Sequence, residues 1–405
     1  MLVIGAGPAG MMCAIVAARG GERVTVLERN DKIGRKLYIT GKGRCNLTNE
    51  SFGQEFESNI VSNPRFMRSG LSRFDSASTR AFFEESGVPT KVERGNRVYP
   101  ASDKSQDIVD ALYRSAKQAG VSIAFGTTVT KVAKEDNDFV VTTDRGEYRD
   151  HVLVIATGGI TYQATGSTGD GYKFAREFGH DVVEPVPSLL GLKAQGTTHL
   201  AGLSLRNVKA WIETDGKKLS EQFGEMLYTH TGVSGPIVLT MSAYVNRLDL
   251  THAILCVDLK PAVDEATLDE RLKTDFQLSP NKLLLNVVKG YLPHALVEDW
   301  ITRAKVDLYK PCNAISREER GRLAHTLKRM EYPLSGLEDA DGGVVTAGGI
   351  NVKEVNPKTM ESKIIPNLYW VGEVLDVDCL TGGYNLQIAF TTGYAAAEAI
   401  LAKGE

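Results

Sequence analysis

The chain has 405 residues, which is room for roughly two or three domains, each with a hydrophobic core of its own. The formal net charge of −3 at pH 7 gives no overall positive field that would attract nucleic acid or an anionic membrane. The five cysteines include no C-x-x-C pair, which argues against a disulfide framework, a zinc site and a dithiol redox centre. No stretch has the length and hydropathy of a membrane-spanning helix. We therefore expect a cytoplasmic protein without a metal, a membrane or a nucleic acid as partner.

The first 28 residues carry the most specific motif. Met1–Ile4 predicts a short apolar strand, and Met11–Ala18 predicts the helix that follows it. Between them, Gly5–Gly10 reads GAGPAG, which is a G-x-G-x-x-G turn. Val24–Leu27 predicts a second strand, which ends in Glu28.

Each part of this unit has a role in dinucleotide binding. Gly5 allows a tight turn, Gly7 lets the backbone approach a pyrophosphate, and Gly10 lets helix and strand pack closely. The helix N-terminus, with Ala9 in its first turn, offers N–H groups and a partial positive charge. A carboxylate in the position of Glu28 holds the ribose hydroxyls. We reject a signal peptide or membrane segment, because this stretch lacks a basic start and contains glycines and a proline.

A basic segment, Asp31–Asn49, follows the acidic residue and has too little apolar periodicity for a core element. It holds the densest basic cluster in the chain: Lys32, Arg35, Lys36, Lys42 and Arg44. Such a cluster is compatible with a nucleic-acid patch, with a solvated loop, or with a loop whose cations and N–H groups face cofactor phosphates. We favour the cofactor loop, because few aromatic residues interrupt the cluster and the overall charge is negative.

Helices and short strands alternate in the following 140 or so residues. Helices are predicted at 63–87 and from Ser102 or Asp103, as cap, to about 119, with a turn-rich connector at 94–100. Strands are predicted at 121–125, 127–134, 139–143, 147–149 and 152–155. The last ends in Ala156-Thr157-Gly158-Gly159, and buried strands of open α/β sheets bind ligands at such ends. A TGSTGDG loop at 165–171 leads into a helix at 172–178 and suits either a cofactor edge or an ordinary capped loop.

The pattern changes after Pro187. Residues 189–263, with about 326–341, predict a β-rich insert domain, and residues 264–325 predict a helical subdomain. Residues 1–188 and 342–405 would then form one discontinuous domain. We expect Leu227–Leu239 to interrupt the β pattern and to pack towards the cofactor. The basic residues of Arg317–Arg329 are mixed with acids, which is typical of a solvated helix face.

The end of the chain repeats the strand–glycine–helix arrangement. Leu368–Val371 predicts a strand that stops at Gly372-Glu373. Leu380–Gln387, which reads LTGGYNLQ, opens a helix that extends to about Ile400. The N–H groups at the start of this helix can face a flavin ring carbonyl or a phosphate, and a simple helix cap is the alternative.

These motifs together resemble one family: GAGPAG, TGKGRCNLTN, ATGG, TGSTGDGY, THTGVSGP, and GEVLDVD followed by GGYNLQ. Over its whole length the chain is identified as a member of the FAD-dependent aminoacetone-oxidase-type flavoproteins. That family includes the bile-acid-inducible N-type reductase and is often labelled NAD(FAD)-utilising dehydrogenases. The resemblance implies an α/β fold with a Rossmann-like FAD-binding domain of the two-dinucleotide-binding-fold type, an inserted β-barrel-like domain and a helical subdomain. It extends to the wider group that contains the fumarate reductase flavoproteins.

The resemblance also implies the contacts to FAD, motif by motif. Glu28 and Arg29 would meet the adenosine ribose, and the backbone of Val129 would meet adenine. The other residues assigned to FAD are Gly5, Gly7, Ala9, Gly10, Lys36, Gly43, Arg44, Cys45, Asn46, Thr157, Gly158, Gly372, Glu373, Gly383, Asn385 and Leu386. Lys42 and Cys379 depart from the family, since both stand where glycine is common. We interpret Cys379 as a neutral exchange rather than a thiol that alters flavin reactivity.

The resemblance makes hydride transfer through N5 of FAD the expected chemistry. The sequence has a single strand–GxGxxG–helix unit, and a separate NAD(P)H-binding domain would need a second one. Therefore either NAD(P)H binds transiently at the flavin, or the substrate itself reduces the flavin. The preferred hypothesis is NAD(P)H-linked reduction of a small or sterol-like substrate at the interface of the FAD domain and the insert. The alternatives are an aminoacetone-type amine oxidase that uses O₂, a flavin-containing RNA-modifying or RNA-binding protein, and a FAD-binding protein without turnover.

His230 and Tyr384 are the candidate catalytic residues. Hydride addition to an enone requires a proton at the adjacent carbon, and either side chain can supply one. Each is equally compatible with a structural role. We interpret Cys45 as a packing residue rather than a redox thiol, because no second cysteine lies near it in the sequence.

Overall fold

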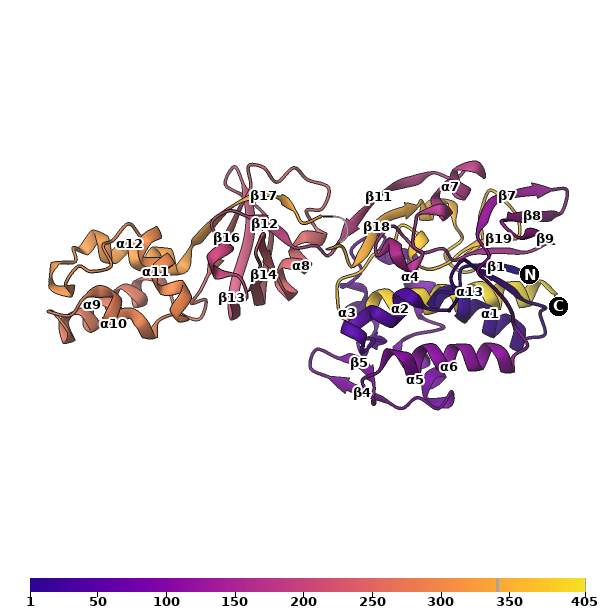
Figure 1. Cartoon of the computed structure of the whole chain (residues 1–405), viewed down its shortest axis with the longest axis horizontal. Helices are drawn as coiled ribbons and strands as arrows, with labels where there is room; N and C mark the ends of the chain where they lie inside the picture. The colour runs from indigo at the N-terminus through magenta and orange to yellow at the C-terminus, as the bar shows by residue number, and fades with distance from the viewer. Residues whose placement is uncertain (340–341, 405) are drawn as a thin grey trace. The chain divides into compact units, whose positions relative to one another are not determined.

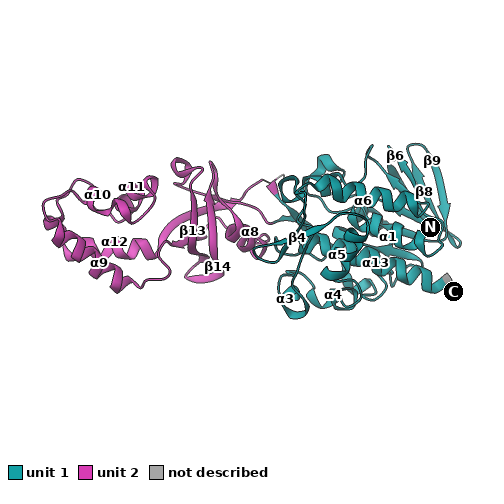
Figure 2. Cartoon of the chain, turned by 90° about the horizontal axis from the view of Figure 1, so that it is seen from below, with its two compact units in different colours: residues 1–188, 343–405 teal, residues 189–342 magenta. Residues whose placement is uncertain are grey.

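The computed structural model describes residues 1–339 and 342–404. The chain forms two compact units, which are coloured separately in Figure 2. Unit 1 comprises Met1–Ser188 and Gly343–Glu405, and unit 2 comprises Leu189–Gly342. Unit 1 therefore contains both ends of the chain, and unit 2 is an insertion in its sequence.

A parallel five-stranded sheet lies at the centre of unit 1, in the order β19-β10-β1-β2-β6. Its strands are β1 (Leu2–Ile4), β2 (Thr25–Glu28), β6 (Ser122–Phe125), β10 (Leu153–Ile155) and β19 (Leu368–Trp370). The runs LVI of β1 and β10 are fully buried, as expected for strands covered on both faces. The chain runs from β1 to one side and returns on the other with β10, so the strand order reverses between these two strands. Open α/β sheets bind ligands outside the carboxyl ends of strands at such a point.

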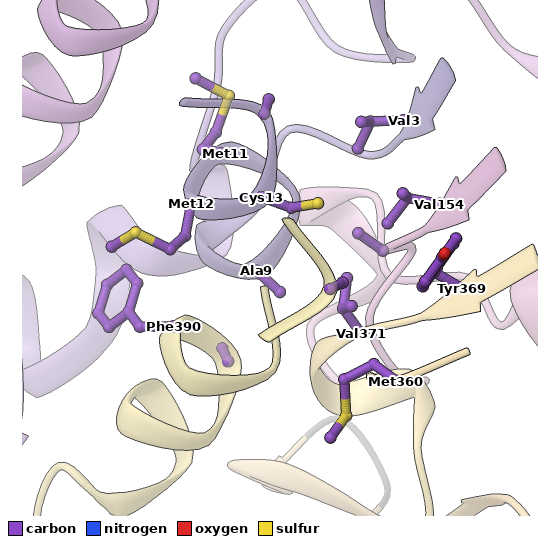
Figure 3. Packing of buried hydrophobic residues seen from close by; sticks show 14 of the residues in the cluster. Val3, Ala9, Met11, Met12, Cys13, Val154, Met360, Tyr369, Val371 and Phe390 are labelled. Atoms are coloured by element: carbon purple, nitrogen blue, oxygen red, sulfur yellow. The ribbon is translucent and has the colours of Figure 1, made fainter. Parts of the chain in front are cut away.

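Helix α1 (Pro8–Arg19) follows β1 directly and packs against the last helix, α13 (Tyr384–Gly404). Figure 3 shows Met12 of α1 beside Phe390 of α13 in this packed layer. Helix α13 begins later than predicted, because Gly382 and Gly383 have φ of 127° and 100°. The other helices of unit 1 are α2 (Arg35–Ile39), α3 (Gly53–Glu57), α4 (Pro64–Leu71), α5 (Ser76–Glu85), α6 (Ser105–Gln118) and α7 (Asp170–Glu177), several of which are labelled in Figure 1.

Unit 1 also holds three small antiparallel sheets. They are β3 (Thr48–Asn49), β5 (Arg97–Pro100) and β4 (Thr90–Glu93) in that order; β7 (Val129–Glu135), β8 (Asp138–Thr143) and β9 (Gly146–Asp150); and β11 (Val182–Ser188) with β18 (Val345–Ile350). The strands predicted at 139–143 and 147–149, on either side of a polar turn, form the hairpin of β8 and β9 as expected. The connector predicted at 94–100 is wrong, since β4 and β5 form a hairpin there.

Two further local predictions are wrong. Asp103 does not cap α6, because its backbone is left-handed, with φ 59°, and its carboxylate accepts from Arg44 and Lys91. The N-cap residue is Lys104, and the Ser102 hydroxyl donates to Asp107. The basic segment is not a loop throughout, since α2 forms within it and buries Leu37.

Unit 2 contains a closed six-stranded barrel in the order β12-β15-β14-β13-β16-β17. Its strands are β12 (Leu192–Ala194), β13 (Ser204–Thr214), β14 (Lys217–Tyr228), β15 (Gly232–Ser234), β16 (Ile254–Asp258) and β17 (Met330–Leu337). Helix α8 (Pro236–Ala243) packs against β14. The hydroxyls of Tyr228 and Tyr332 lie 2.8 Å apart in the buried interior, so each phenol has a partner.

Helices α9 (Glu265–Leu278), α10 (Leu284–Val287), α11 (His294–Arg303) and α12 (Arg317–Lys328) complete unit 2. Asp264 caps α9, and Ser316 with Glu319 forms a capping box at the start of α12. Trp300 is fully buried among these helices and donates its indole N–H to the carbonyl of Leu323. The predicted fold class, α/β with a parallel Rossmann-like sheet, a barrel and a helical part, is confirmed. In the described part of the chain, no helix has the length and apolar character needed to cross a membrane.

Candidate functional site

Three glycine turns meet at the carboxyl edge of the central sheet. Gly5, which follows β1, has φ 103°, and a Cβ there would lie 2.5 Å from the carbonyl oxygen of Ala156, which follows β10. A Cβ on Gly10 would lie 2.1 Å from the carbonyl oxygen of Gly5. Gly372, which follows β19, has φ 79° and would place a Cβ 2.8 Å from the Cβ of Ala9. The backbones therefore approach more closely here than side chains would permit.

The start of α1 fits a pyrophosphate. Met11 makes the first backbone hydrogen bond of the helix, to the carbonyl of Gly7, so the N–H groups of Ala9 and Gly10 point out of its first turn. A Cβ added at Gly7 would meet no atom within 4 Å, so space is open beside this backbone. Free N–H groups, the helix dipole and this open space together suit an anionic group such as the pyrophosphate of a dinucleotide.

Glu28 lies at the end of β2 and is 7% exposed. Its Oε2 accepts the N–H of Ala6 at 2.8 Å, and its Oε1 accepts the N–H and the side-chain amide of Asn30 at 2.8 and 2.7 Å. Asn30 also donates to the carbonyl of Thr165, and Arg29 forms an ion pair with Asp170 at 3.1 Å. The carboxylate is thus fixed beside the turn of α1 and joined to the TGSTGDG loop.

Lys36 and Glu373, both assigned to the cofactor, form an ion pair with each other. The Lys36 ammonium lies 2.6 Å from Oε2 of Glu373 and donates to the hydroxyl of Thr161 at 2.8 Å. Oε1 of Glu373 accepts the N–H of Thr346 at 2.8 Å. The two side chains are 19% and 21% exposed, so the pair is partly shielded from water and fixes α2 against the turn that follows β19.

Arg44 is engaged by protein groups on several sides. Its guanidinium donates to Glu93 and to Asp103, each at 2.5 Å, and lies 4.2 Å from the centroid of the Tyr99 ring. These carboxylates raise the pKa of the Arg44 guanidinium. The contacts favour a positioning role for Arg44 over direct contact with a phosphate.

The neighbours of Arg44 differ in their burial. Cys45 is fully buried with φ 58°, and burial raises the pKa of its thiol to about 12, which keeps it protonated and unreactive. The side-chain oxygen of Asn46 is buried and has no hydrogen-bond partner among the described residues. Gly43 has φ 83° and no neighbour within 4 Å of a Cβ position. Lys42 is exposed and left-handed, with φ 58°.

The segment after β10 contributes Thr157 and Gly158. The Thr157 hydroxyl is buried without a hydrogen-bond partner in the described structure, and Gly158 has φ 73°. A Cβ on Gly158 would lie 3.0 Å from the hydroxyl of Ser167, so this turn also touches the TGSTGDG loop. Val129 starts β7, opposite Thr143, in the small sheet of β7, β8 and β9.

The turn before α13 is closely held. A Cβ on Gly383 would lie 2.3 Å from the carbonyl oxygen of Thr48. The Asn385 side chain exchanges hydrogen bonds with the backbone N–H and carbonyl of Cys379 at 2.9 and 2.8 Å. Burial raises the pKa of the Cys379 thiol, as expected for a small packing residue. Leu386 packs against the core of unit 1.

The two predicted proton donors belong to different units. Tyr384 starts α13 in unit 1, and its ring packs edge-on against Phe56 with centroids 4.9 Å apart. Burial raises the pKa of its phenol, which therefore stays protonated. His230 is exposed between β14 and β15 in unit 2, where its carbonyl accepts from Thr198. Neither unit by itself contains both residues.

Sequence reasoning missed three polar residues of this region: Asn30, Asn49 and Thr161. Asn30 could have been found from its place directly after the strand-end acid. Asn49 and Thr161 act across long stretches of chain, on Gly382 and Lys36, and no local pattern indicates such contacts.

Comparison with known proteins confirms the predicted resemblance. The family model described as the HI0933-like protein Rossmann domain matches residues 1–399. A ribosomal RNA dihydrouridine synthase of Haemophilus influenzae is 32% identical, covering 98% of both chains. A 3-dehydro-bile acid delta(4,6)-reductase of Clostridium scindens is 30% identical over 98% of both chains. A ribosomal RNA dihydrouridine synthase of Escherichia coli is 31% identical over 99% of this chain and 98% of its own.

Solved structures share the fold at lower identity. The 3-ketosteroid delta1-dehydrogenase of Sterolibacterium denitrificans gives a TM-score of 0.52 at 13% identity, with 99% of both chains covered. The 3-ketosteroid-delta4-(5alpha)-dehydrogenase of Rhodococcus jostii gives 0.50 at 16% identity, with 99% of this chain and 96% of the other covered. These likenesses support the fold alone.

Proposed function

Because the chain belongs to the HI0933-like FAD-binding Rossmann family and is an FAD-dependent oxidoreductase, we propose that it reduces a carbon–carbon double bond conjugated to a carbonyl, with NAD(P)H as electron donor. One observation carries the proposal. Three relatives that match over nearly the whole chain are named for different substrates but for the same bond change. A dihydrouridine arises when hydrogen adds across the ring double bond of uridine, and a delta(4,6)-reductase adds hydrogen to double bonds of a steroid.

The residues of unit 1 support this chemistry by holding FAD. The N–H groups of Ala9 and Gly10 would bind the pyrophosphate, and Glu28 would accept a hydrogen bond from a ribose hydroxyl. The ion pair of Lys36 and Glu373 would lie along the ribityl chain. When bound there, FAD supplies a carrier that takes a hydride from NAD(P)H and delivers it to the substrate.

Reduction of a conjugated double bond also needs a proton, which reaches the carbon next to the carbonyl. We propose Tyr384 as the donor, because its phenol lies directly after the Gly382-Gly383 turn and burial keeps it protonated. His230 is the second candidate, in unit 2. A small or sterol-like organic enone is the preferred substrate class.

A second candidate substrate is uridine within ribosomal RNA. Two of the three relatives above carry that name, at 32% and 31% identity. The net charge of −3 argues against an RNA substrate, because the affinity of proteins for RNA depends on basic groups that neutralise phosphates. Both substrates present a double bond next to a carbonyl, so the proposed reaction is common to them.

Anaerobic flavin reduction tests the proposal. The FAD-loaded protein is mixed with NADH or NADPH, and the visible absorbance of the flavin is followed. We expect one nucleotide to bleach the flavin and a 3-keto-4-ene steroid or a uridine-containing rRNA fragment to restore its colour without oxygen. Bleaching by aminoacetone and not by either nucleotide would contradict the proposal and identify an amine oxidase. No bleaching by any donor would indicate a protein without turnover.

A further inference from the structure

We infer that the small sheet of β3, β5 and β4 holds two cofactor segments in one fixed relative position, with Arg44 and Asn49 as positioning residues. The first segment is residues 40–46, here called the basic loop. The second is Gly382-Gly383, here called the C-terminal turn. The inference rests on the proposed function, because both segments carry residues that the family resemblance assigns to FAD.

The basic loop depends on the sheet for its shape. Gly41, Lys42 and Gly43 are successively left-handed, with φ of 56°, 58° and 83°, and this conformation is unfavourable for a lysine. Arg44 attaches the loop to the sheet, because it donates to Glu93 at the end of β4 and its guanidinium lies over the ring of Tyr99 in β5. An unfavourable backbone of this kind persists only where its surroundings fix it.

The C-terminal turn is held by β3, which is the opposite edge strand of the same sheet from β4. The side-chain amide of Asn49, in β3, donates at 3.0 Å to the carbonyl of Gly382 and at 3.0 Å to the carbonyl of Gly95. Asn49 is 2% exposed, so water cannot replace these hydrogen bonds. The neighbouring Thr48 hydroxyl donates at 2.6 Å to Gln387 in the first turn of α13.

The two anchors converge on one hairpin. Glu93, the acceptor for Arg44, ends β4, and Gly95, the acceptor for Asn49, lies two positions later in the turn to β5. The segment between the two anchors is also bonded to the sheet, since the N–H of Leu47 donates to the carbonyl of Val98 in β5 at 2.8 Å. A displacement of this hairpin therefore moves the basic loop and the C-terminal turn together.

Substitution of both anchors, singly and together, tests this coupling. Arg44→Lys keeps the charge but loses the forked contact to two carboxylates. Asn49→Asp keeps the size but turns an oxygen towards two carbonyl oxygens. We expect each change to weaken FAD binding about tenfold. We expect the double variant to bind FAD about tenfold more weakly than wild type as well, and not about a hundredfold more weakly. The reason is that either change alone already releases both segments. Both single variants should also shift the flavin midpoint potential in the same direction.

Arg73→Lys is the matched control. Arg73 lies in the same unit, its side chain is 34% exposed against 35% for Arg44, and it pairs with Glu398 at 2.8 Å. Because Arg73 contacts neither cofactor segment, its substitution should leave FAD affinity and potential unchanged. Equal losses in the control would show a general effect of stability and overturn the inference.

Hydrogen exchange of the wild-type protein gives a test that needs no variant. Added FAD should slow exchange in the basic loop, in β5 and in the C-terminal turn together. Protection confined to one segment, or multiplicative losses in the double variant, would overturn the inference while leaving the proposed function intact. A folded wild-type protein that takes up no FAD would overturn both.

Discussion

Glu28 shows how a single residue connects the fold to the cofactor. Its carboxylate accepts one N–H from the turn before α1 and two from Asn30. A carboxylate has about four acceptor positions, so one remains for a ribose hydroxyl after these three are used. The residue therefore orders the turn and recognises the ribose at the same time.

The exchange Glu28→Gln should weaken FAD binding by about tenfold or more, because an amide has one acceptor oxygen and its NH₂ group would face the N–H donors. Quenching of flavin fluorescence in a titration measures this. Asp31→Asn is the control, since Asp31 is exposed nearby and loses the same charge. Equal affinities of the Glu28→Gln variant and wild type would contradict the assignment.

His180 is a buried histidine held in its neutral form. Its Nε2 accepts from the indole N–H of Trp370 at 3.3 Å and lies 2.9 Å from the Ser362 hydroxyl. Since Nε2 is an acceptor, the proton of the neutral ring lies on Nδ1, which faces Glu354 at 3.2 Å. Burial lowers the pKa of His180 and outweighs the opposing effect of Glu354.

This arrangement predicts a stability change with pH. The unfolded chain takes up a proton at His180 near a pKa of about 6.5, and the folded protein does so only at lower pH. The contribution of neutral His180 to the free energy of unfolding should therefore be fully present above about pH 6.5. This contribution should fall as the pH drops towards the lowered pKa of the folded protein. Urea unfolding across this range should show a smaller decrease for His180→Gln than for wild type. Identical slopes in the two proteins would contradict the prediction.

The proposed proton donors can be separated from structural residues by two substitutions. In Tyr384→Phe the ring packing on Phe56 is retained and only the hydroxyl is lost. If the phenol supplies the proton, turnover should fall by about a hundredfold or more while the visible flavin spectrum stays unchanged. His230→Ala is the parallel test in unit 2. Loss of FAD in either variant would mark that residue as structural.

In the strand–turn–helix element of β1 and α1, different glycines serve folding and ligand binding. Gly10 lies against the backbone of Gly5, and an added Cβ would be 2.1 Å from the Gly5 carbonyl oxygen. Gly7 has φ −77°, which alanine adopts freely, and an added Cβ would meet nothing within 4 Å. Gly10 therefore serves the packing of the element, and Gly7 serves the ligand.

The two alanine substitutions should differ accordingly. Gly10→Ala should lower the free energy of unfolding by about 1–3 kcal/mol through overpacking. Gly7→Ala should change it by less than about 1 kcal/mol but should weaken FAD binding by roughly tenfold or more, because a methyl group would occupy the space of the pyrophosphate. Thermal unfolding without FAD and a FAD titration measure the two effects. A Gly7→Ala variant with unchanged affinity would contradict the assignment.

The elements that the sequence predicts correctly are those with a strong local pattern. β1 and β10 are continuous apolar runs, and the turns after them are marked by glycine. The hairpin of β4 and β5 was missed because its strands have four residues each and TKVE has little apolar character. The contacts of Arg44 were missed with it, since Glu93 and Asp103 lie 49 and 59 positions away in the chain. Such distant pairings depend on tertiary structure and leave no local pattern.

At the scale of the whole molecule, each unit has a hydrophobic core of its own. The core of unit 1 joins the central sheet to α1 and α13. The core of unit 2 joins the barrel interior to α9, α11 and α12. The residues assigned to FAD above all lie in unit 1, together with both ends of the chain, whereas the alternative proton donor His230 lies in unit 2. Unit 1 therefore contains every residue that is proposed above to bind FAD.

The measurement that tests this account most directly is a titration of the folded wild-type protein with FAD. The described residues contain one strand–GxGxxG–helix unit, so we expect uptake of one FAD per chain, with quenched flavin fluorescence and a yellow protein after gel filtration. A protein that is folded by circular dichroism but leaves added FAD free in solution would contradict the central claim.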